Sequence, residues 1–181
     1  GYACSISRPY GVLAVVVNAW FFFTAPAYAE NMTILIVGDS LTAGFGLAEF
    51  DSFPAQMERS LRKSGRDVRI VNAGVSGDTS AGGRARLAWA IAENPDAVIL
   101  ELGANDGLRG LDPKQTEVNL DVMIREIKRR KIPVLLAGMR APPNLGSEYE
   151  VEFNGLYRRL VEKHDILFYP FFLEGVAAIP E

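Results

Sequence analysis

The run Thr33-Ile34-Leu35-Ile36-Val37-Gly38 is short, apolar and closed by glycine, which predicts a buried β-strand. After this run, similar apolar runs alternate along the chain with segments whose apolar residues recur at helical spacing. Further strands are expected at 68–71, 97–102, 132–138 and 166–169, and helices at 53–64, 81–93, 116–130 and 148–164. Strands rich in Val, Ile and Leu that alternate with helices are typical of a parallel sheet buried on both faces. The sequence therefore predicts one α/β domain, a sandwich around a five-stranded parallel sheet.

The composition fits a single soluble domain. The 181 residues are 49% hydrophobic and 23% charged, which supplies enough apolar material for a sizeable core. The net charge of -3 offers no basic surface of the kind that binds nucleic acid, so no nucleic-acid partner is expected. With one cysteine, Cys4, and one histidine, His164, a Cys/His zinc site is excluded and no metal site is expected.

Residues 1–29 have the pattern of a secretory signal peptide. Arg8 is the one charge before Glu30, an apolar run covers 11–23, and a small-x-small tripeptide (AYA) predicts cleavage before Glu30. The alternative is a membrane anchor, but crossing the bilayer core takes about 20 apolar residues and this run is shorter. We therefore expect a mature domain at 30–181 that is exported to the periplasm and has no stable membrane anchor.

Three loops at the carboxyl ends of the expected strands carry polar residues at the edge where parallel sheets bind ligands. Ser40, at a strand-to-helix turn, is placed to be a nucleophile whose own N–H can hold an oxyanion; the alternative is a helix N-cap. Gly74 can offer an unobstructed N–H, or it is a plain turn glycine. The Asn105 side chain can donate to an oxyanion, or it forms an Asx turn. Taken loop by loop, both interpretations stay open.

Gly-Asp-Ser-Leu at 38–41, Gly74, and Gly-Ala-Asn-Asp at 103–106 follow one another in this order, and together they resemble the SGNH hydrolases, also called the GDSL family. The resemblance covers essentially the whole expected domain. It implies a flavodoxin-like three-layer α/β/α sandwich that uses neither a metal nor an organic cofactor. It also implies that Ser40 is the nucleophile, and that the oxyanion hole consists of the backbone N–H groups of Ser40 and Gly74 and the side chain of Asn105.

Serine ester hydrolysis is the function that this resemblance implies, with small aryl or acyl esters, thioesters or lysophospholipids as substrates. The alternative is a relative that binds lipid or carbohydrate without catalysis. A flavodoxin-like nucleotide binder is a more distant option, because no Gly-Lys-Ser/Thr follows the first loop. Nothing in the sequence demands a partner protein, so a monomer is expected.

The sequence departs from the family pattern at the last block, Asp-x-x-His, which supplies the general base and the aspartate that orients it. No Asp-x-x-His occurs in residues 1–181. His164 is expected at the amino-terminal edge of the sheet, opposite Ser40, where a cationic side chain at a helix end is ordinary. We therefore expect an incomplete C-terminus, a missing final helix that leaves one sheet face exposed, and negligible esterase activity from residues 30–181.

Five neighbours of the site are expected to contact substrate: Asp39, Leu41, Asp106, Leu108 and Pro142. Asp39 and Leu41 flank the nucleophile, while Leu108 and Pro142 lie in loops that follow the third and fourth strands. For the two aspartates, capping and turn roles are the alternative. The loops of Leu108 and Pro142 can equally be ordinary surface loops.

Overall fold

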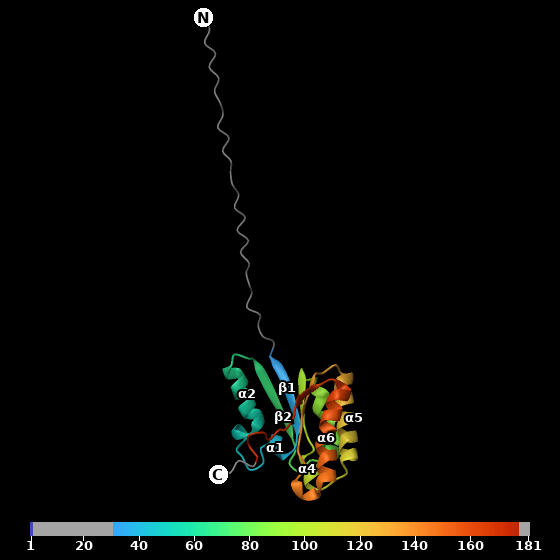
Figure 1. Ribbon diagram of the computed structural model, residues 1–181. Coiled ribbons are helices and arrows are strands. Elements are labelled where there is room, and N and C mark those ends of the chain that lie inside the picture. Colours follow the sequence, from blue (N-terminus) through green and yellow to red (C-terminus); the bar gives the residue numbers. More distant parts are fainter. Residues whose placement is uncertain (2–30, 178–181) are drawn as a thin grey trace.

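The computed structural model describes Gly1 and residues 31–177 (Figure 1). The predicted signal peptide, 1–29, therefore lies outside the described residues except for Gly1. Within them, five parallel strands form one sheet in the order β2-β1-β3-β4-β5. The strands are β1 (Met32–Gly38), β2 (Val68–Gly74), β3 (Ala97–Glu101), β4 (Val134–Ala137) and β5 (Leu167–Tyr169). This confirms the predicted α/β class and the five-stranded parallel sheet.

Helices lie on both faces of the sheet, with α2 on one side and α5 and α6 on the other (Figure 1). α3 packs on β1 and against α5, which places it in the same layer as α5 and α6. The α-helices are α1 (Ser40–Ala43), α2 (Phe53–Lys63), α3 (Ser80–Ala90), α4 (Ala104–Leu108), α5 (Pro113–Arg129) and α6 (Ser147–His164). Three short 3-10 helices connect them: η1 (Glu49–Asp51), η2 (Ile91–Glu93) and η3 (Pro143–Leu145). The result is the three-layer α/β/α arrangement that the sequence analysis expected.

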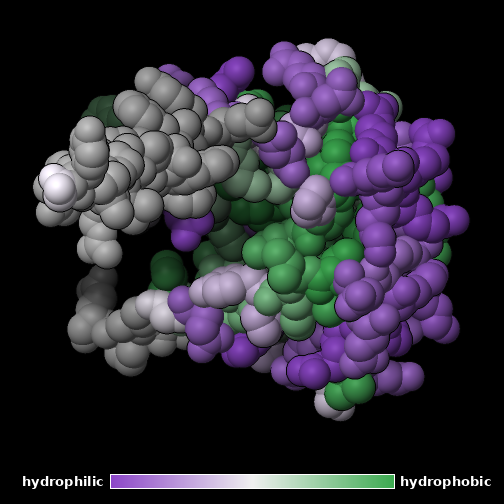
Figure 2. Space-filling model, turned by 90° about the horizontal axis from the view of Figure 1, so that it is seen from above, coloured by the Kyte–Doolittle hydropathy of each residue, from purple (hydrophilic) through white to green (hydrophobic). Residues whose placement is uncertain are grey.

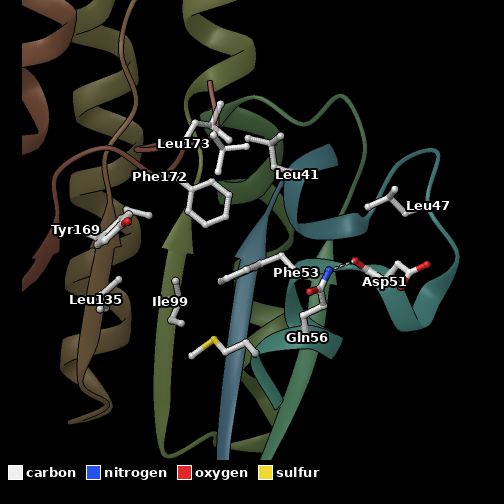
Figure 3. A pocket seen from close by; sticks show the side chains of 13 residues that line it. Leu41, Leu47, Asp51, Phe53, Gln56, Ile99, Leu135, Tyr169, Phe172 and Leu173 are labelled. Carbon is white, nitrogen blue, oxygen red and sulfur yellow. Dashed lines mark hydrogen bonds between the residues drawn. The ribbon is translucent and has the colours of Figure 1, made fainter. Parts of the chain in front are cut away.

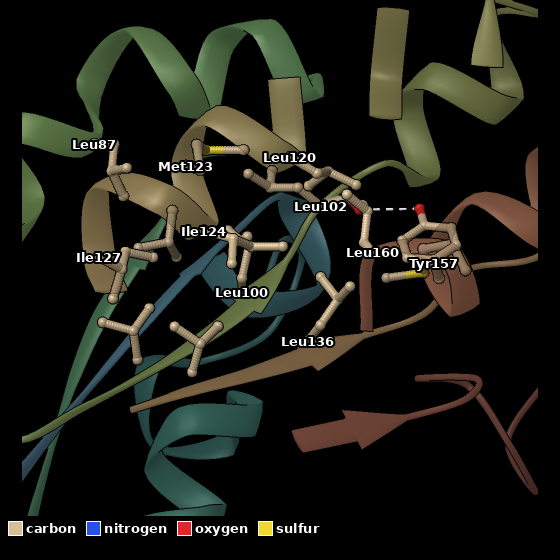
Figure 4. Packing of buried hydrophobic residues seen from close by; sticks show 14 of the residues in the cluster. Leu87, Leu100, Leu102, Leu120, Met123, Ile124, Ile127, Leu136, Tyr157 and Leu160 are labelled. Atoms are coloured by element: carbon tan, nitrogen blue, oxygen red, sulfur yellow. Dashed lines mark hydrogen bonds between the residues drawn. The ribbon is translucent and has the colours of Figure 1, made fainter. Parts of the chain in front are cut away.

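The main core lies between the sheet and the layer of α3, α5 and α6 (Figure 4). Successive side chains of a strand point to opposite faces, so alternate residues such as Leu100 of β3 and Leu136 of β4 face this layer. From α5, Leu120, Met123 and Ile127 meet them at helical spacing, and all three are fully buried. Seen along the strands, the outer side of the helical layer is hydrophilic and hydrophobic residues gather inward (Figure 2). Burial of apolar residues on one face of α5 therefore fixes the helix on the sheet.

The other face of the sheet carries α2, which packs on β2. Over β3, β4 and β5 this face holds a cavity of about 600 Å³ rather than a helix of the described residues. Its floor includes Ile99 and Leu135, and its walls include Phe53 of α2 and Phe172 after β5 (Figure 3).

The carboxyl ends of three adjacent strands, β2, β1 and β3, meet at one level, and this arrangement positions the site. Gly38 of β1 pairs with Gly74 of β2 on one side and with Glu101 of β3 on the other. The two short helices that follow β1 and β3, α1 and α4, lie at this same end of the sheet (Figure 1). No helix among residues 31–177 combines the length and the apolar composition that a membrane crossing needs.

Candidate active site

Ser40 begins α1 directly after the turn that ends β1. Asp39 is the N-cap of this helix, and its carboxylate accepts a hydrogen bond of 2.9 Å from the N–H of Leu41. The helix closes after one turn at Gly44, whose φ of 78° is in the left-handed region. Ser40 itself is half-buried, and no hydrogen bond within the described residues uses its N–H. The turn therefore presents a hydroxyl and a backbone donor together at a helix N-terminus, as predicted, while Asp39 rather than Ser40 takes the N-cap role.

Asn105 brings the three loops together. Its Nδ2 donates to the carbonyl oxygen of Asp78 over 2.9 Å and lies 3.3 Å from Oδ2 of Asp39. Asp78 precedes α3 and Asp39 precedes Ser40, so one amide group connects the ends of β1, β2 and β3. The structure thus places Asn105 beside the turn of Ser40, where the sequence analysis expected it.

Gly74 has a role different from the predicted one. Its N–H donates to Oδ1 of Asn72 over 2.9 Å, so this donor is already engaged. A Cβ at Gly74 would lie 2.3 Å from the backbone nitrogen of Ala43, which shows that the glycine lets α1 approach β2. The structure therefore favours the alternative reading of Gly74, a glycine that serves packing.

The sequence analysis missed Gly77, which lies three residues further along the same loop. It is exposed, its φ is 85°, and no hydrogen bond within the described residues uses its N–H. Its carbonyl oxygen accepts a hydrogen bond of 2.9 Å from Nη2 of Arg109, which fixes the peptide next to Asp78. The signal in the sequence is a glycine followed by Asp-Thr at the start of a helix, where Thr79 is the N-cap of α3. Gly77 thus offers the free backbone donor that Gly74 lacks.

Asp106 is not a substrate contact. It is 2% exposed, and its Oδ2 accepts the N–H of Ser80 over 2.8 Å. Its Oδ1 accepts the hydroxyl of Ser80 over 2.5 Å and that of Thr116 over 3.1 Å. The carboxylate therefore joins α4 to the first turns of α3 and α5. The prediction that Asp106 binds substrate is wrong, because its side chain points into the protein.

The prediction that Asp39 contacts substrate is also wrong. It is 1% exposed, and both of its carboxylate oxygens are used by groups of the protein, Leu41 and Asn105. Burial is the main cause that raises its pKa above the ordinary value, and the nearby carboxylates of Asp106 and Asp78 add to it. Asp39 thus shapes the site without reaching into it.

Three other predicted contacts are distributed around the site. Leu41 lines the cavity on the α2 face, Leu108 is 71% exposed, and Pro142 is half-buried just before η3. Neither Ser40 nor Asn105 lines that cavity, so it belongs to the open sheet face and not to the polar site. Substrate contact by these three residues stays a prediction.

His164 lies at the opposite end of the molecule. It ends α6 just before β5, and its Nε2 is 2.7 Å from Oδ1 of Asp121. Lys163 and Arg125 also pair with this carboxylate, at 2.8 and 3.0 Å. Although burial acts to raise the pKa of Asp121, the hydrogen bonds from Lys163 and His164 lower it below the ordinary value. The structure confirms that His164 occupies the amino-terminal edge, far from the turn of Ser40.

Within residues 31–177, no group of three or more His, Cys, Asp or Glu side chains is arranged to hold a metal ion. At the carboxyl end of the sheet, the described residues offer the hydroxyl and the N–H of Ser40, the N–H of Gly77 and the side chain of Asn105. Such a set can accept an acyl group and stabilise the oxyanion that forms during its transfer.

The chain is similar to known hydrolases over most of its length. A family model described as the GDSL-like Lipase/Acylhydrolase family matches residues 36–179. "Esterase TesA" of Pseudomonas aeruginosa is 43% identical over 152 residues, which cover 83% of this chain and 76% of that protein. "Thioesterase 1/protease 1/lysophospholipase L1" of Escherichia coli K12 is 38% identical over 150 residues, 82% of this chain and 71% of that protein. The crystal structure of AlinE4, an SGNH-hydrolase family esterase, matches with a TM-score of 0.81 and 51% identity, covering 83% of this chain and 82% of that one.

Proposed function

Because the chain belongs to the GDSL-like lipase/acylhydrolase family, we propose that it cleaves carboxylic esters by transferring their acyl group to Ser40 and then to water. Family membership makes it a hydrolase of the GDSL esterase type. The observation that carries the proposed mechanism is the single amide of Asn105, which connects the turn of Ser40 to the loop before α3. A nucleophile and polarised donors from three strand ends are what acyl transfer requires.

The oxyanion hole in this proposal is formed by the N–H groups of Ser40 and Gly77 and by Nδ2 of Asn105, which exchanges its long contact of 3.3 Å with Oδ2 of Asp39 for the oxyanion. Gly77 replaces Gly74 because the N–H of Gly74 is bonded to Asn72, while that of Gly77 is free of partners within the described residues. Attack by Oγ of Ser40 on the ester carbon moves an electron pair onto the carbonyl oxygen, and these donors stabilise the resulting charge. Removing one such donor typically costs about 10²–10³ in kcat.

The proton of the Ser40 hydroxyl must pass to a base before the acyl group is transferred, and then to the leaving group. His164 cannot be this base, because it lies at the other edge of the sheet. We therefore assign the role of the base to none of the residues 31–177. The family resemblance implies the histidine of an Asp-x-x-His segment. We therefore keep the prediction that residues 30–181 alone hydrolyse p-nitrophenyl acetate negligibly; a rate that matches intact relatives and disappears in Ser40→Ala would contradict it.

The test of the proposed function is ester hydrolysis by the full-length protein. Ser40→Ala should lower the rate on p-nitrophenyl esters by about 10⁴-fold or more, and Asn105→Ala by about 10²–10³-fold. Ser147→Ala is the matched control, because Ser147 is an exposed serine at the start of α6. This variant should hydrolyse the esters at the wild-type rate. Full activity in Ser40→Ala would refute the mechanism. A folded product without hydrolysis that still binds lipid or carbohydrate would favour the non-catalytic alternative.

The substrates that we propose are small esters and thioesters, with lysophospholipids as a further class, because the similar proteins are named as an esterase and as a thioesterase and lysophospholipase. We also propose that the protein acts as a monomer in the periplasm, without a membrane anchor. The sequence of 1–29 supports export, and N-terminal sequencing of protein recovered from the periplasm tests it: the expected first residue is Glu30.

A further inference from the structure

Glu101, the last residue of β3, is a buried carboxyl group that the proposed mechanism does not use. It is 0% exposed, and its Oε2 accepts the hydroxyl of Thr42 over 2.6 Å and the N–H of Asp39 over 3.3 Å. These two groups lie on either side of Ser40 in the chain. The carboxyl group is therefore bonded to both ends of the turn that carries the proposed nucleophile.

The space around this contact is filled by the carboxyl group. A Cβ at Gly38 would lie 2.4 Å from Oε2 of Glu101 and 2.1 Å from Oγ1 of Thr42. The end of β1, the turn and the Glu101 side chain are thus packed against one another without room for a larger residue. Any displacement of the Glu101 carboxyl group has to move the turn.

The second oxygen of Glu101, Oε1, is buried and has no hydrogen-bond partner within the described residues. A carboxylate keeps negative charge on both oxygens, and a buried charged oxygen without a donor is costly. A neutral acid places its proton on one oxygen and carries no net charge, so the surroundings of Oε1 favour the neutral form.

The neighbouring charges act in the same direction. Burial first, and then the charge of Asp39, raise the pKa of Glu101 to about 8. Each carboxylate oxygen of Asp39 accepts an N–H donor, whereas both donors to Glu101 bind Oε2 and Oε1 accepts none, so Asp39 is the member of the pair that carries the charge. The other titratable and charged groups around this pair are Asp78 before α3, Arg86 of α3, Asp106 of α4 and Tyr157 of α6. Arg86 is the one cation among them, and it is paired with Asp78 and with the carbonyl oxygen of Gly38.

We propose that Glu101 is a positioning residue: as a neutral acid it holds residues 39–42 in place beneath Ser40, and loss of its proton displaces this turn. The inference about the turn rests on the packing and hydrogen bonds of Glu101. Its consequence for ester hydrolysis rests on the proposed function. In mildly alkaline solution Glu101 loses its proton, and a second negative charge forms beside that of Asp39. Because the buried site cannot solvate this charge, the turn moves away from Glu101.

Backbone amide chemical shifts of the ¹⁵N-labelled full chain, followed from pH 6 to 10, test the inference without requiring activity. In the wild type the amides of Asp39, Ser40 and Leu41 should titrate together with a midpoint near 8. Glu101→Gln keeps the shape of the neutral acid but has no proton to lose, so this midpoint should disappear. Glu148→Gln, which changes an exposed carboxyl group in the first turn of α6, is the control and should leave it unchanged.

A second variant keeps the inference testable if Glu101→Gln does not fold. The hydrogen bond from Thr42 lowers the pKa of Glu101, so Thr42→Val should move the midpoint of the turn amides to higher pH. The inference is overturned if the turn amides of the wild type show no alkaline midpoint. It is also overturned if such a midpoint exists but is neither moved by Thr42→Val nor removed by Glu101→Gln.

In the hydrolytically active gene product, kcat/KM should fall roughly tenfold per pH unit above the same midpoint, and this fall should be absent in Glu101→Gln. The two proposals can fail separately. Hydrolysis that survives Ser40→Ala refutes the proposed function and leaves the amide titration standing. Ser40-dependent hydrolysis without an alkaline midpoint in the turn refutes only the role of Glu101.

Discussion

Replacement of Asp106 by asparagine distinguishes a structural role from substrate binding. In the wild type the two carboxylate oxygens accept the N–H and the hydroxyl of Ser80 and the hydroxyl of Thr116. These bonds join α4 to the beginnings of α3 and α5. Asparagine has the same shape, but one of its two acceptor oxygens becomes a donating NH₂ group.

The size of the effect follows from the donors around Asp106. If the NH₂ group faces the N–H of Ser80, two donors oppose each other and neither can turn away. If the NH₂ group faces the two hydroxyls instead, these must turn to accept from it. The Ser80 hydroxyl already accepts from Nδ2 of Asn119 over 3.0 Å, which limits how far it can rotate. Losing a hydrogen bond to a charged acceptor costs about 1.5–3 kcal/mol, and an unsatisfied buried donor adds about 1–3 kcal/mol. We therefore expect Asp106→Asn to lower the free energy of unfolding by about 2.5–6 kcal/mol.

Urea unfolding followed by far-UV circular dichroism measures this change. With a slope of about 2 kcal/mol per molar urea, the unfolding midpoint should fall by about 1–3 M. Asp67→Asn is the matched control, because Asp67 is exposed just before β2 and its midpoint should stay at the wild-type value. If Asp106→Asn unfolds with the wild-type midpoint and instead raises KM in the active gene product, the structural role is refuted and the original prediction of substrate contact is restored.

Three further changes test other parts of the structure. Gly74→Ala places a methyl group against a backbone atom of α1 and should destabilise the fold by about 1–3 kcal/mol or more in urea unfolding, whereas Gly155→Ala within α6 should be neutral or stabilising. Arg86→Lys replaces a guanidinium that binds two partners by an ammonium that cannot span both, so the thermal midpoint should fall by several degrees; an unchanged midpoint would show that the network is dispensable. The pKa of Asp121 is lowered in the folded state, so the stability that it contributes is present above the unfolded value of 3.8 and is lost as the pH falls through the folded value. Between pH 5 and 2, Asp121→Asn should therefore lose less stability than the wild type, and equal losses would contradict the pairing.

Three of the strands were predictable because their residues are mostly apolar and largely buried. Strands of this kind read as continuous apolar runs, so 33–38, 97–102 and 132–138 could be recognised without knowing their partners. The short helix α4 was not predicted, and for α1 the sequence predicted the strand-to-helix turn at Ser40 but not the extent of the helix. Helices of four and five residues are too short for an apolar period, and they are defined by local backbone geometry such as the φ of 118° at Gly103.

For the site, the sequence predicted which loops meet but not which side chains face the solvent. Ser40 and Asn105 follow β1 and β3, which are neighbours in the sheet, so their proximity follows from strand order. Asp106 is adjacent to Asn105 in the chain, yet successive residues of a helix point in directions about 100° apart. One of the two side chains therefore reaches the edge of the sheet while the other enters the protein, and composition alone does not tell which.

The choice between two glycines shows the same limit in the backbone. Gly74 and Gly77 both follow the second apolar run, and the end of that run could not be placed from apolar residues alone, because the strand continues through Asn72. Pairing of Gly74 with Gly38 keeps β2 going for three residues past its last large apolar side chain, so Gly74 is still in the sheet while Gly77 is in the loop. A free N–H at the sheet edge requires a residue beyond the last strand pair, and Gly77, with its positive φ, meets that requirement. The register of β2 on β1, rather than the glycine itself, therefore decides which N–H is free for the proposed oxyanion hole.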